Sequence, residues 1–301
     1  MKRVKRQGML AAWVGGLTCL VFLGLGCSGS SGGGGGTATV TTLLTVDSES
    51  LAVAAAEAAA RFESARDVEI SDIESLTLTI TEVSLDYAGA DGNGDDGDDS
   101  DADAKVVAFA GTMDVDILDL MDISAVLSSA GLPAGVYDKI RLSITNPRLI
   151  LKSDPGNVIT DIHLTANGRL FVSKSFELPA GELYLLILRF VDIHLVELGN
   201  GGYVLTPQLR ADIDIEPAEA LVSGTIIAID RAADTLFVAL ADGTTIEIHY
   251  TDALIFLPID TATPTGTEDD LAEGQEVAVT GTMWVDGSLT ADTIEILSTG
   301  P

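Results

Sequence analysis

The chain has 301 residues, and its 46 acidic side chains against 16 basic ones give a formal net charge of −30 at pH 7. A surface of this charge repels nucleic acid and anionic lipid headgroups and attracts cations, so nucleic acid is excluded as a partner. There are two cysteines, Cys19 and Cys27. If residues 1–26 are removed as a signal peptide, Cys27 is the one cysteine left. A single cysteine excludes an intramolecular disulfide and a cysteine-based zinc site.

Residues 1–26 have the pattern of a secretory signal peptide. Four basic residues lie among the first six, and an apolar run follows from Met9 to Gly26. The segment Leu23-Gly24-Leu25-Gly26-Cys27 resembles the lipobox of bacterial lipoproteins, although Gly24 stands where that family usually has leucine. The resemblance implies that Cys27 is lipidated and becomes the mature N-terminus. The alternative is an uncleaved anchor helix, since about 18 apolar residues nearly span a bilayer.

Residues 27–37 favour cleavage, because they form a Gly/Ser tether of the kind that separates a lipid anchor from a folded domain. The lipid on Cys27 would then hold the protein in the cell envelope, and Ser28 in the next position favours the outer membrane. The mature chain is long enough for two domains with cores of their own. We expect these domains at residues 38–216 and 219–298.

Most of the first domain has the alternation of polar and apolar residues that is typical of β-strands. Thr39–Val46 predicts an opening strand, and Ser75–Tyr87 alternates leucine or isoleucine with threonine. Two helices are also expected. The alanine-dense segment Leu51–Phe62 has high helix propensity, and Ile117–Ala130 is expected to hold one short helix.

An acidic loop insertion at residues 90–104 is the sharpest chemical feature of the sequence. Calcium prefers six to eight hard oxygen ligands from a loop that folds around it. The candidate ligands are Asp91, Asn93, Asp95, Asp96, Asp98 and Asp99. The glycine of an EF-hand arrives one position late, and the loop joins two predicted strands rather than two helices. Two interpretations stay open: a self-repelling acidic loop, and a weak or multisite calcium site.

Leu183–Leu188 is apolar on both faces, which predicts a central strand. The run is too short to span a membrane, and Arg189 and Asp192 interrupt its continuation. The pattern restarts after Glu216-Pro217, where five or six short strands follow. Asp242-Gly243 and Asp286-Gly287 are typical of tight hairpin turns. This spacing predicts a small barrel.

Several segments of the first domain resemble a bacterial lipoprotein family catalogued as domain of unknown function 4382. They are Leu118 with Leu120, the run Leu132-Pro133-Ala134-Gly135-Val136-Tyr137-Asp138-Lys139-Ile140-Arg141-Leu142, Phe176 with Pro179-Ala180-Gly181, and Tyr203-Val204-Leu205-Thr206-Pro207-Gln208-Leu209-Arg210. The resemblance covers about residues 38–216. The alanine-rich segment and the acidic loop depart from it.

The tail resembles a second family, catalogued as domain of unknown function 5666. The matching segments are Val222-Ser223-Gly224-Thr225-Ile226, Asp270-Leu271-Ala272-Glu273-Gly274-Gln275-Glu276-Val277 and Val279-Thr280-Gly281-Thr282. Together the two resemblances imply an all-β chain, with an immunoglobulin- or transthyretin-like β-sandwich followed by a small OB-like β-barrel. Neither family implies an activity or a catalytic set.

The histidines give little support to a metal site. His163 and His194 each stand in Asp-Ile-His-Leu, where alternation places the aspartate and the histidine on one face of a strand. We interpret both as ordinary residues of partly solvated strands, and His249 lies far from them in the sequence. The sequence has neither the Gly-x-Ser-x-Gly elbow of serine hydrolases nor the His-Glu-x-x-His metal motif.

The expected function is that of a membrane-anchored surface lipoprotein, a non-catalytic binding, adhesion or structural module, and the calcium interpretation of the acidic loop would make that module calcium-dependent. Its partner would be an unknown protein or polysaccharide. Nucleic acid is excluded for the barrel too, since residues 219–301 hold 15 acidic residues and a single basic one, Arg231. The alternative is a cell-surface hydrolase acting on polysaccharide, because paired carboxylates are possible anywhere in so acidic a chain.

Overall fold

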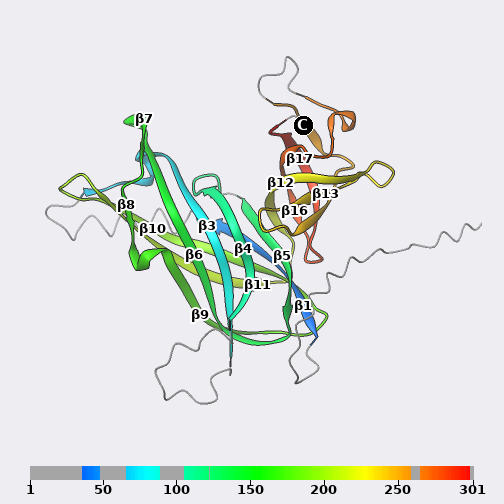
Figure 1. Ribbon diagram of the computed structural model, residues 1–301, viewed down its shortest axis with the longest axis horizontal. Helices are drawn as coiled ribbons and strands as arrows, with labels where there is room; N and C mark the ends of the chain where they lie inside the picture. Colours follow the sequence, from blue (N-terminus) through cyan, green and yellow to red (C-terminus); the bar gives the residue numbers. More distant parts are fainter. Residues whose placement is uncertain (1–35, 48–65, 89–104, 122, 259–264, 299–301) are drawn as a thin grey trace, which may run out of the picture. The chain divides into compact units, whose positions relative to one another are not determined.

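The computed structural model describes residues 36–47, 66–88, 105–121, 123–258 and 265–298 (Figure 1). All of them belong to one compact unit. The predicted helix at Leu51–Phe62 lies outside the described residues. Within the described residues, no helix combines the length and the apolar character needed to cross a bilayer.

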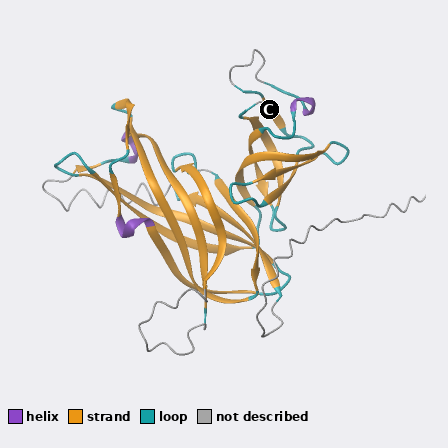
Figure 2. Ribbon diagram, in the orientation of Figure 1, coloured by secondary structure: helices purple, strands orange, loops and turns teal. Residues whose placement is uncertain are grey.

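The described chain is all-β, as the sequence predicted, and Figure 2 shows strands joined by loops and three short 3-10 turns. The strands are β1 (Thr37–Val46), β2 (Arg66–Asp67), β3 (Ile73–Tyr87), β4 (Lys105–Asp116), β5 (Ser124–Pro133), β6 (Gly135–Leu151), β7 (Asp154–Ile159), β8 (Ile162–Leu164), β9 (Arg169–Leu178), β10 (Leu183–Glu197), β11 (Tyr203–Asp214), β12 (Ala218–Asp230), β13 (Thr235–Ala239), β14 (Thr245–His249), β15 (Leu254–Phe256), β16 (Glu276–Met283) and β17 (Ser288–Ile296). The 3-10 turns are η1 (Ile70–Asp72), η3 (Thr165–Gly168) and η4 (Glu268–Asp270).

The two sheets of the sandwich enclose one apolar core. The first is the β5-β1-β10-β11-β8 part of a 12-stranded sheet that continues from β5 into β12, and the second runs β4-β3-β6 with both β7 and β9 paired to β6. Inward residues of both sheets are fully buried, among them Leu78 on β3, Leu142 on β6 and Leu188 on β10. The apolar positions of the alternating strands thus supply the core, as their period of two requires.

Strand β10 confirms the prediction of a central strand at Leu183–Leu188. It pairs in parallel with β1 on one side and antiparallel with β11 on the other. Leu186 and Leu188 belong to the sandwich core, whereas Leu185 and Ile187 pack into a second apolar cluster with residues of β12 to β17. A strand with a core on each face needs a continuous apolar run, which explains why alternation is lost here.

The C-terminal strands are paired in a closed circuit. Strand β12 pairs with β13, β13 with β14, β14 with β17, β17 with β16, and β16 returns to β12. The β14–β17 pair is parallel and the other four are antiparallel. This is an OB-like strand order. The predicted hairpin glycines Gly243 and Gly287 have φ of +84° and +83°, as tight turns require.

The predicted short helix within Ile117–Ala130 is wrong. Residues 117–120 form a turn, and β5 begins at Ser124. The strand pairs with β1 along most of its length and with β12 at Ala220 and Leu221. Val126 packs into the second apolar cluster while Leu127 packs into the sandwich core. Tertiary pairing on both edges and burial on both faces therefore override the local helix propensity.

Candidate functional site

The sites predicted from the sequence lie outside the described residues. This holds for Cys27 and for the candidate calcium ligands Asp91, Asn93, Asp95, Asp96, Asp98 and Asp99. The strands on either side of the acidic insertion are described: β3 ends at Tyr87, β4 begins at Lys105, and the two are antiparallel neighbours. The insertion therefore joins two strands, as predicted, and not the two helices of an EF-hand.

The structure places the three histidines in separate surroundings. His163 is exposed on β8, and the Nε2 atom of His194 on β10 lies 3.6 Å from Asp67 Oδ1. His249 on β14 lies with Nδ1 3.2 Å from the hydroxyl of Thr235. Across the described part of the chain, no three His, Cys, Asp or Glu side chains are grouped closely enough to hold a metal ion.

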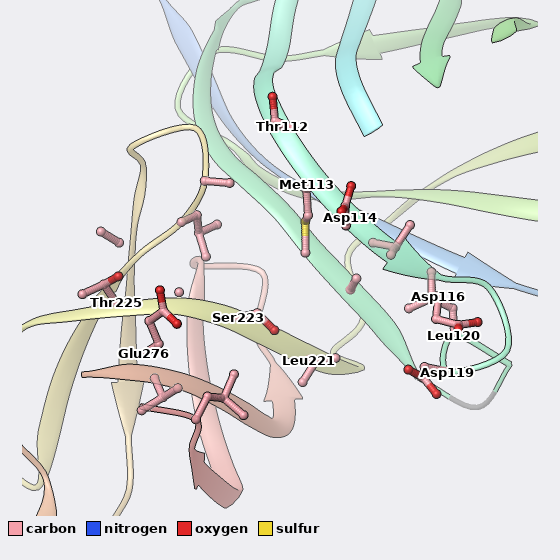
Figure 3. A pocket seen from close by; sticks show the side chains of 18 residues that line it. Thr112, Met113, Asp114, Asp116, Asp119, Leu120, Leu221, Ser223, Thr225 and Glu276 are labelled. Carbon is pink, nitrogen blue, oxygen red and sulfur yellow. The ribbon is translucent and has the colours of Figure 1, made fainter. Parts of the chain in front are cut away.

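A cleft of about 500 Å³ separates the end of the sandwich from the OB-like strands. One wall comes from β4, the turn after it and the start of β5, and the other from β12, β13 and β16. Figure 3 shows Asp114, Asp116 and Asp119 on the first wall and Glu276 on the second. The cleft is lined by Thr112, Met113, Asp114, Val115, Asp116, Asp119, Leu120, Ala125, Leu221, Ser223, Gly224, Thr225, Ala239, Leu240, Ala241, Glu276, Val277 and Leu297. We call it the acidic cleft.

Asp116 is held at the end of β4 by three donors. Its Oδ2 accepts a hydrogen bond from the Ser75 hydroxyl, and its Oδ1 accepts one from the backbone N–H of Leu118 at 2.9 Å and a longer one from Leu76 at 3.4 Å. Three donors converging on one side chain fix its rotamer. Asp116 is thus a preorganised carboxylate that also shapes the turn leading to Asp119.

Asp119 lies in the turn that follows β4. Burial raises the pKa of the Asp119 carboxyl above its usual value, and the negative charge of Asp116 adds to the effect. The neighbouring carboxyl groups of Asp116 and Asp119 are a local source of negative potential in the cleft. A cation entering between the walls would relieve that repulsion.

Asp114 is anchored away from this pair. Its Oδ1 accepts a hydrogen bond from the hydroxyl of Thr79 at 2.5 Å, and Oδ2 accepts one from the guanidinium of Arg148. The hydrogen bond from Thr79 is the main cause that lowers the pKa of Asp114, and Arg148 contributes further. Arg148 neutralises one of the four carboxylates at the cleft, and three remain.

The second wall adds polar and apolar groups from the OB-like strands. Thr225 on β12 stands opposite Glu276 on β16 in the antiparallel ladder, and Ser223 stands two residues before Thr225. Leu221 and Leu240 give the cleft an apolar component. Of the described residues that line the cleft, none is basic. The arrangement suits a ligand that carries positive charge beside apolar groups.

One sequence pattern points to this site, although the sequence-based predictions did not include it. Asp114-Val115-Asp116 alternates acid and apolar residue on a strand, and Val115 is buried while both aspartates line the cleft. Such a pattern places two carboxylates on one face. Glu276 carries no comparable signal, because it reaches the cleft through the pairing of β12 with both β5 and β16.

Comparison with known proteins identifies a family for the central part of the chain to be compared with. Residues 65–207 match the family described as Domain of unknown function (DUF4382). No curated protein matched the chain, and no solved structure matched it. The matched range contains the sandwich wall of the acidic cleft and ends before the wall formed by β12, β13 and β16. The central part of this chain, residues 65–207, is therefore similar to a family of unknown function.

Proposed function

We propose that the protein is a membrane-anchored surface lipoprotein whose folded body is a non-catalytic binding or adhesion module. The leader, the cysteine at position 27 and the Gly/Ser tether support the anchor. An outer-membrane location follows from Ser28 after the lipidated cysteine. The tail is proposed to be a unit of the domain of unknown function 5666 kind, since its Val-Ser-Gly-Thr-Ile segment lies on β12 of an OB-like circuit.

The acidic cleft is the observation that carries the binding role. It is about 500 Å³ in volume, it is lined by four carboxylates, and Asp116 is fixed by three donors before any ligand arrives. Preorganised polar groups beside apolar lining are typical of binding sites. We propose that the ligand is a basic, partly apolar segment of another envelope protein, because charge complementarity favours it over an acidic polymer.

Photo-crosslinking in cells tests this assignment. A photo-reactive residue at Thr225, in the cleft, is expected to give a discrete adduct with a partner protein. The same probe at Val158, an exposed position on β7, is the matched control and is expected to give none. A Glu276→Lys substitution is expected to remove the Thr225 adduct by reversing one charge of the cleft. The same adducts from Thr225 and Val158, or none from either, would rule out the cleft as the binding site.

Calcium dependence is a second part of the proposal, and it rests on the acidic insertion. A ligand that binds only the folded state raises the melting temperature. Melting of the full chain with chelator, calcium or magnesium at matched ionic strength tests it. A rise specific to calcium, lost when Asp91, Asp95 and Asp99 become asparagine, is the expected result. Equal melting in calcium and magnesium would show that the insertion is no calcium site.

One observation favours the alternative of a polysaccharide hydrolase. Asp119 has a raised pKa and lies beside Asp116, whose carboxylate accepts a hydrogen bond from Ser75, and a pair of carboxyl groups in different surroundings resembles the acid and the base of glycoside cleavage. The purified full chain is to be screened against polysaccharides. Turnover that disappears in Asp119→Asn, while the adduct between the Thr225 probe and the partner protein persists, would establish the hydrolase. Absence of turnover on every substrate would favour binding alone.

A further inference from the structure

A second surface carries charge of the opposite sign to the acidic cleft. It lies on the solvent face of the second sheet, over β4, β3, β6 and β9, and is formed by Lys105, Lys139, Arg141, Arg169 and Phe171. We call it the basic face. The four cations are a large share of the 12 lysines and arginines that follow the leader in this strongly acidic chain.

The strand register brings these side chains together. Lys105 and Lys139 are both opposite Asp86 in the ladders of β3, and Arg141 is opposite Phe171 across β6 and β9. Arg169 is opposite Ser143, one step further along the same face. The intervening residues point inward, since Leu85, Ile140 and Leu142 are fully buried. The five side chains therefore share the outer face of neighbouring strands.

The carboxylates within the basic face are already paired. Arg141 contacts both oxygens of Asp86 through Nε and Nη2, at 2.6 to 3.1 Å, and Lys139 Nζ lies 3.7 Å from the same carboxylate. Lys105 pairs with Glu82 at 2.6 Å. None of the described carboxylates forms an ion pair with Arg169. Among the described residues of this face, four cations stand against two carboxylates, which is an excess of positive charge.

An exposed aromatic ring lies in the middle of these cations. Phe171 is 63% exposed, and the Nζ of Lys139 lies 6.0 Å from its ring centroid. The ring borders a hollow of about 370 Å³ whose lining includes Lys105, Arg141 and Arg169. Exposure of one large apolar side chain is unremarkable by itself. The Phe171 ring, however, is flanked by guanidinium and ammonium groups beside a hollow. An apolar surface and anion-binding groups therefore lie at one place.

We propose that the basic face binds an acidic polysaccharide, a sugar chain that bears carboxylate or sulfate groups. Arginine is suited to such groups because its planar fork donates two parallel hydrogen bonds. The Phe171 ring would pack against the apolar face of a sugar ring, a contact that a small inorganic anion cannot use. Physiological salt screens charges beyond about 8 Å, so the local cations act despite the negative charge of the whole protein. The inference goes beyond the proposed function, since it concerns a different surface.

Isothermal titration of the full chain tests the proposal at about 0.15 M salt, where distant acidic residues are screened. The probes are oligogalacturonate, which carries carboxylates, dextran sulfate, which carries sulfates, neutral dextran and inorganic sulfate. Binding of at least one acidic polysaccharide, with no heat from neutral dextran or inorganic sulfate, is the expected result. Equal binding of neutral and acidic chains, or no binding of either, would overturn the proposal.

Substitutions locate the site and separate it from general charge effects. Arg169→Gln and Phe171→Ala are each expected to weaken binding about tenfold, the loss typical of one well-placed contact. The control is Arg210→Gln on β11, which removes an equal charge from an exposed side chain of the other sheet. Its affinity is expected to stay within about twofold of the wild type, as distant charges are screened. An equal loss in the control would show non-specific attraction and overturn the proposal.

Variants of the chain also distinguish two alternative occupants of the basic face from a polysaccharide. Self-association that Arg169→Gln abolishes, without polysaccharide binding, would assign the face to a second copy of the chain. Polysaccharide binding that appears only after Asp91, Asp95 and Asp99 become asparagine would assign it to the chain's own acidic insertion. Either result contradicts the proposal. Melting temperatures of all variants equal to that of the wild type show that they remain folded.

Discussion

Tyr137 donates a hydrogen bond from its hydroxyl to the carbonyl oxygen of Pro133, 2.7 Å away and four residues earlier in the chain. Tyr87 donates in the same way to the next carbonyl, that of Ala134. Gly135 completes the turn with φ of +155°, and a Cβ atom there would overlap the Tyr87 ring. The Leu-Pro-Ala-Gly-x-Tyr segment is therefore a turn between β5 and β6 whose carbonyls are satisfied by two tyrosines.

Replacing Tyr137 by phenylalanine tests this description of the turn. Tyr137 is fully buried, so Tyr137→Phe leaves the carbonyl of Pro133 without its partner and is expected to destabilise the protein by about 1–2 kcal/mol. Tyr184→Phe is the control, because Tyr184 is half-buried on β10 and its hydroxyl has no hydrogen bond with a described residue. Urea denaturation measures both. An equal loss in the two variants would show that the hydrogen bond to Pro133 contributes nothing.

Alkaline pH gives an independent measure of the same side chain. Burial raises the pKa of Tyr137 to about 12, and the neighbouring Tyr87 adds to the shift. Between pH 10 and that value the unfolded chain loses this proton and the folded chain keeps it. Stability therefore falls as pH rises through this window, with a slope of at most about 1.4 kcal/mol per pH unit from this group. Unfolding measured across the window is expected to depend less on pH in Tyr137→Phe than in the wild type.

The sequence predicted the fold class because its signals are local. The run of β10 that is apolar on both faces, and the Asp-Gly turns that precede β14 and β17, can be read from neighbouring residues alone. Strand β5 was missed because its pairing with β1 and β12 comes from distant parts of the chain. The same reason hides the acidic cleft, since Asp119 and Glu276 meet only through those pairings. The basic face depends on three ladders in register, which residue patterns do not specify.

We expect the protein to become more stable when either of two buried hydroxyl side chains in the first sheet is replaced by an apolar one. Thr42 and Ser128 are directly opposite each other in the β1–β5 ladder, both are fully buried, and neither hydroxyl has a hydrogen-bond partner among the described atoms. Thr42→Val and Ser128→Ala are each expected to stabilise by about 1 kcal/mol, because an unpaired buried hydroxyl is unfavourable. The neighbouring Thr41 shares a hydrogen bond of 3.0 Å with Ser129. Thr41→Val is the control and is expected to destabilise; stabilisation in all three would show that apolar burial alone is responsible.

Gly224 on β12, in the Val-Ser-Gly-Thr-Ile segment, is a position at which we expect the OB-like circuit to tolerate no side chain. A Cβ atom there would lie 2.2 Å from the carbonyl oxygen of Ala239, which belongs to the backbone of β13 and cannot rotate away. Gly224→Ala is therefore expected to destabilise by about 1–3 kcal/mol, the usual cost of forcing atoms into packed structure.

The matched control is Gly131→Ala on β5, because a Cβ atom at Gly131 meets nothing within 4 Å. Alanine there is expected to be neutral or to stabilise by about 0.5–1 kcal/mol, since glycine loses more conformational freedom on folding. Urea midpoints at unchanged slope measure both. A Gly224→Ala variant as stable as Gly131→Ala would mean that β12 and β13 do not approach as closely as the closed circuit requires.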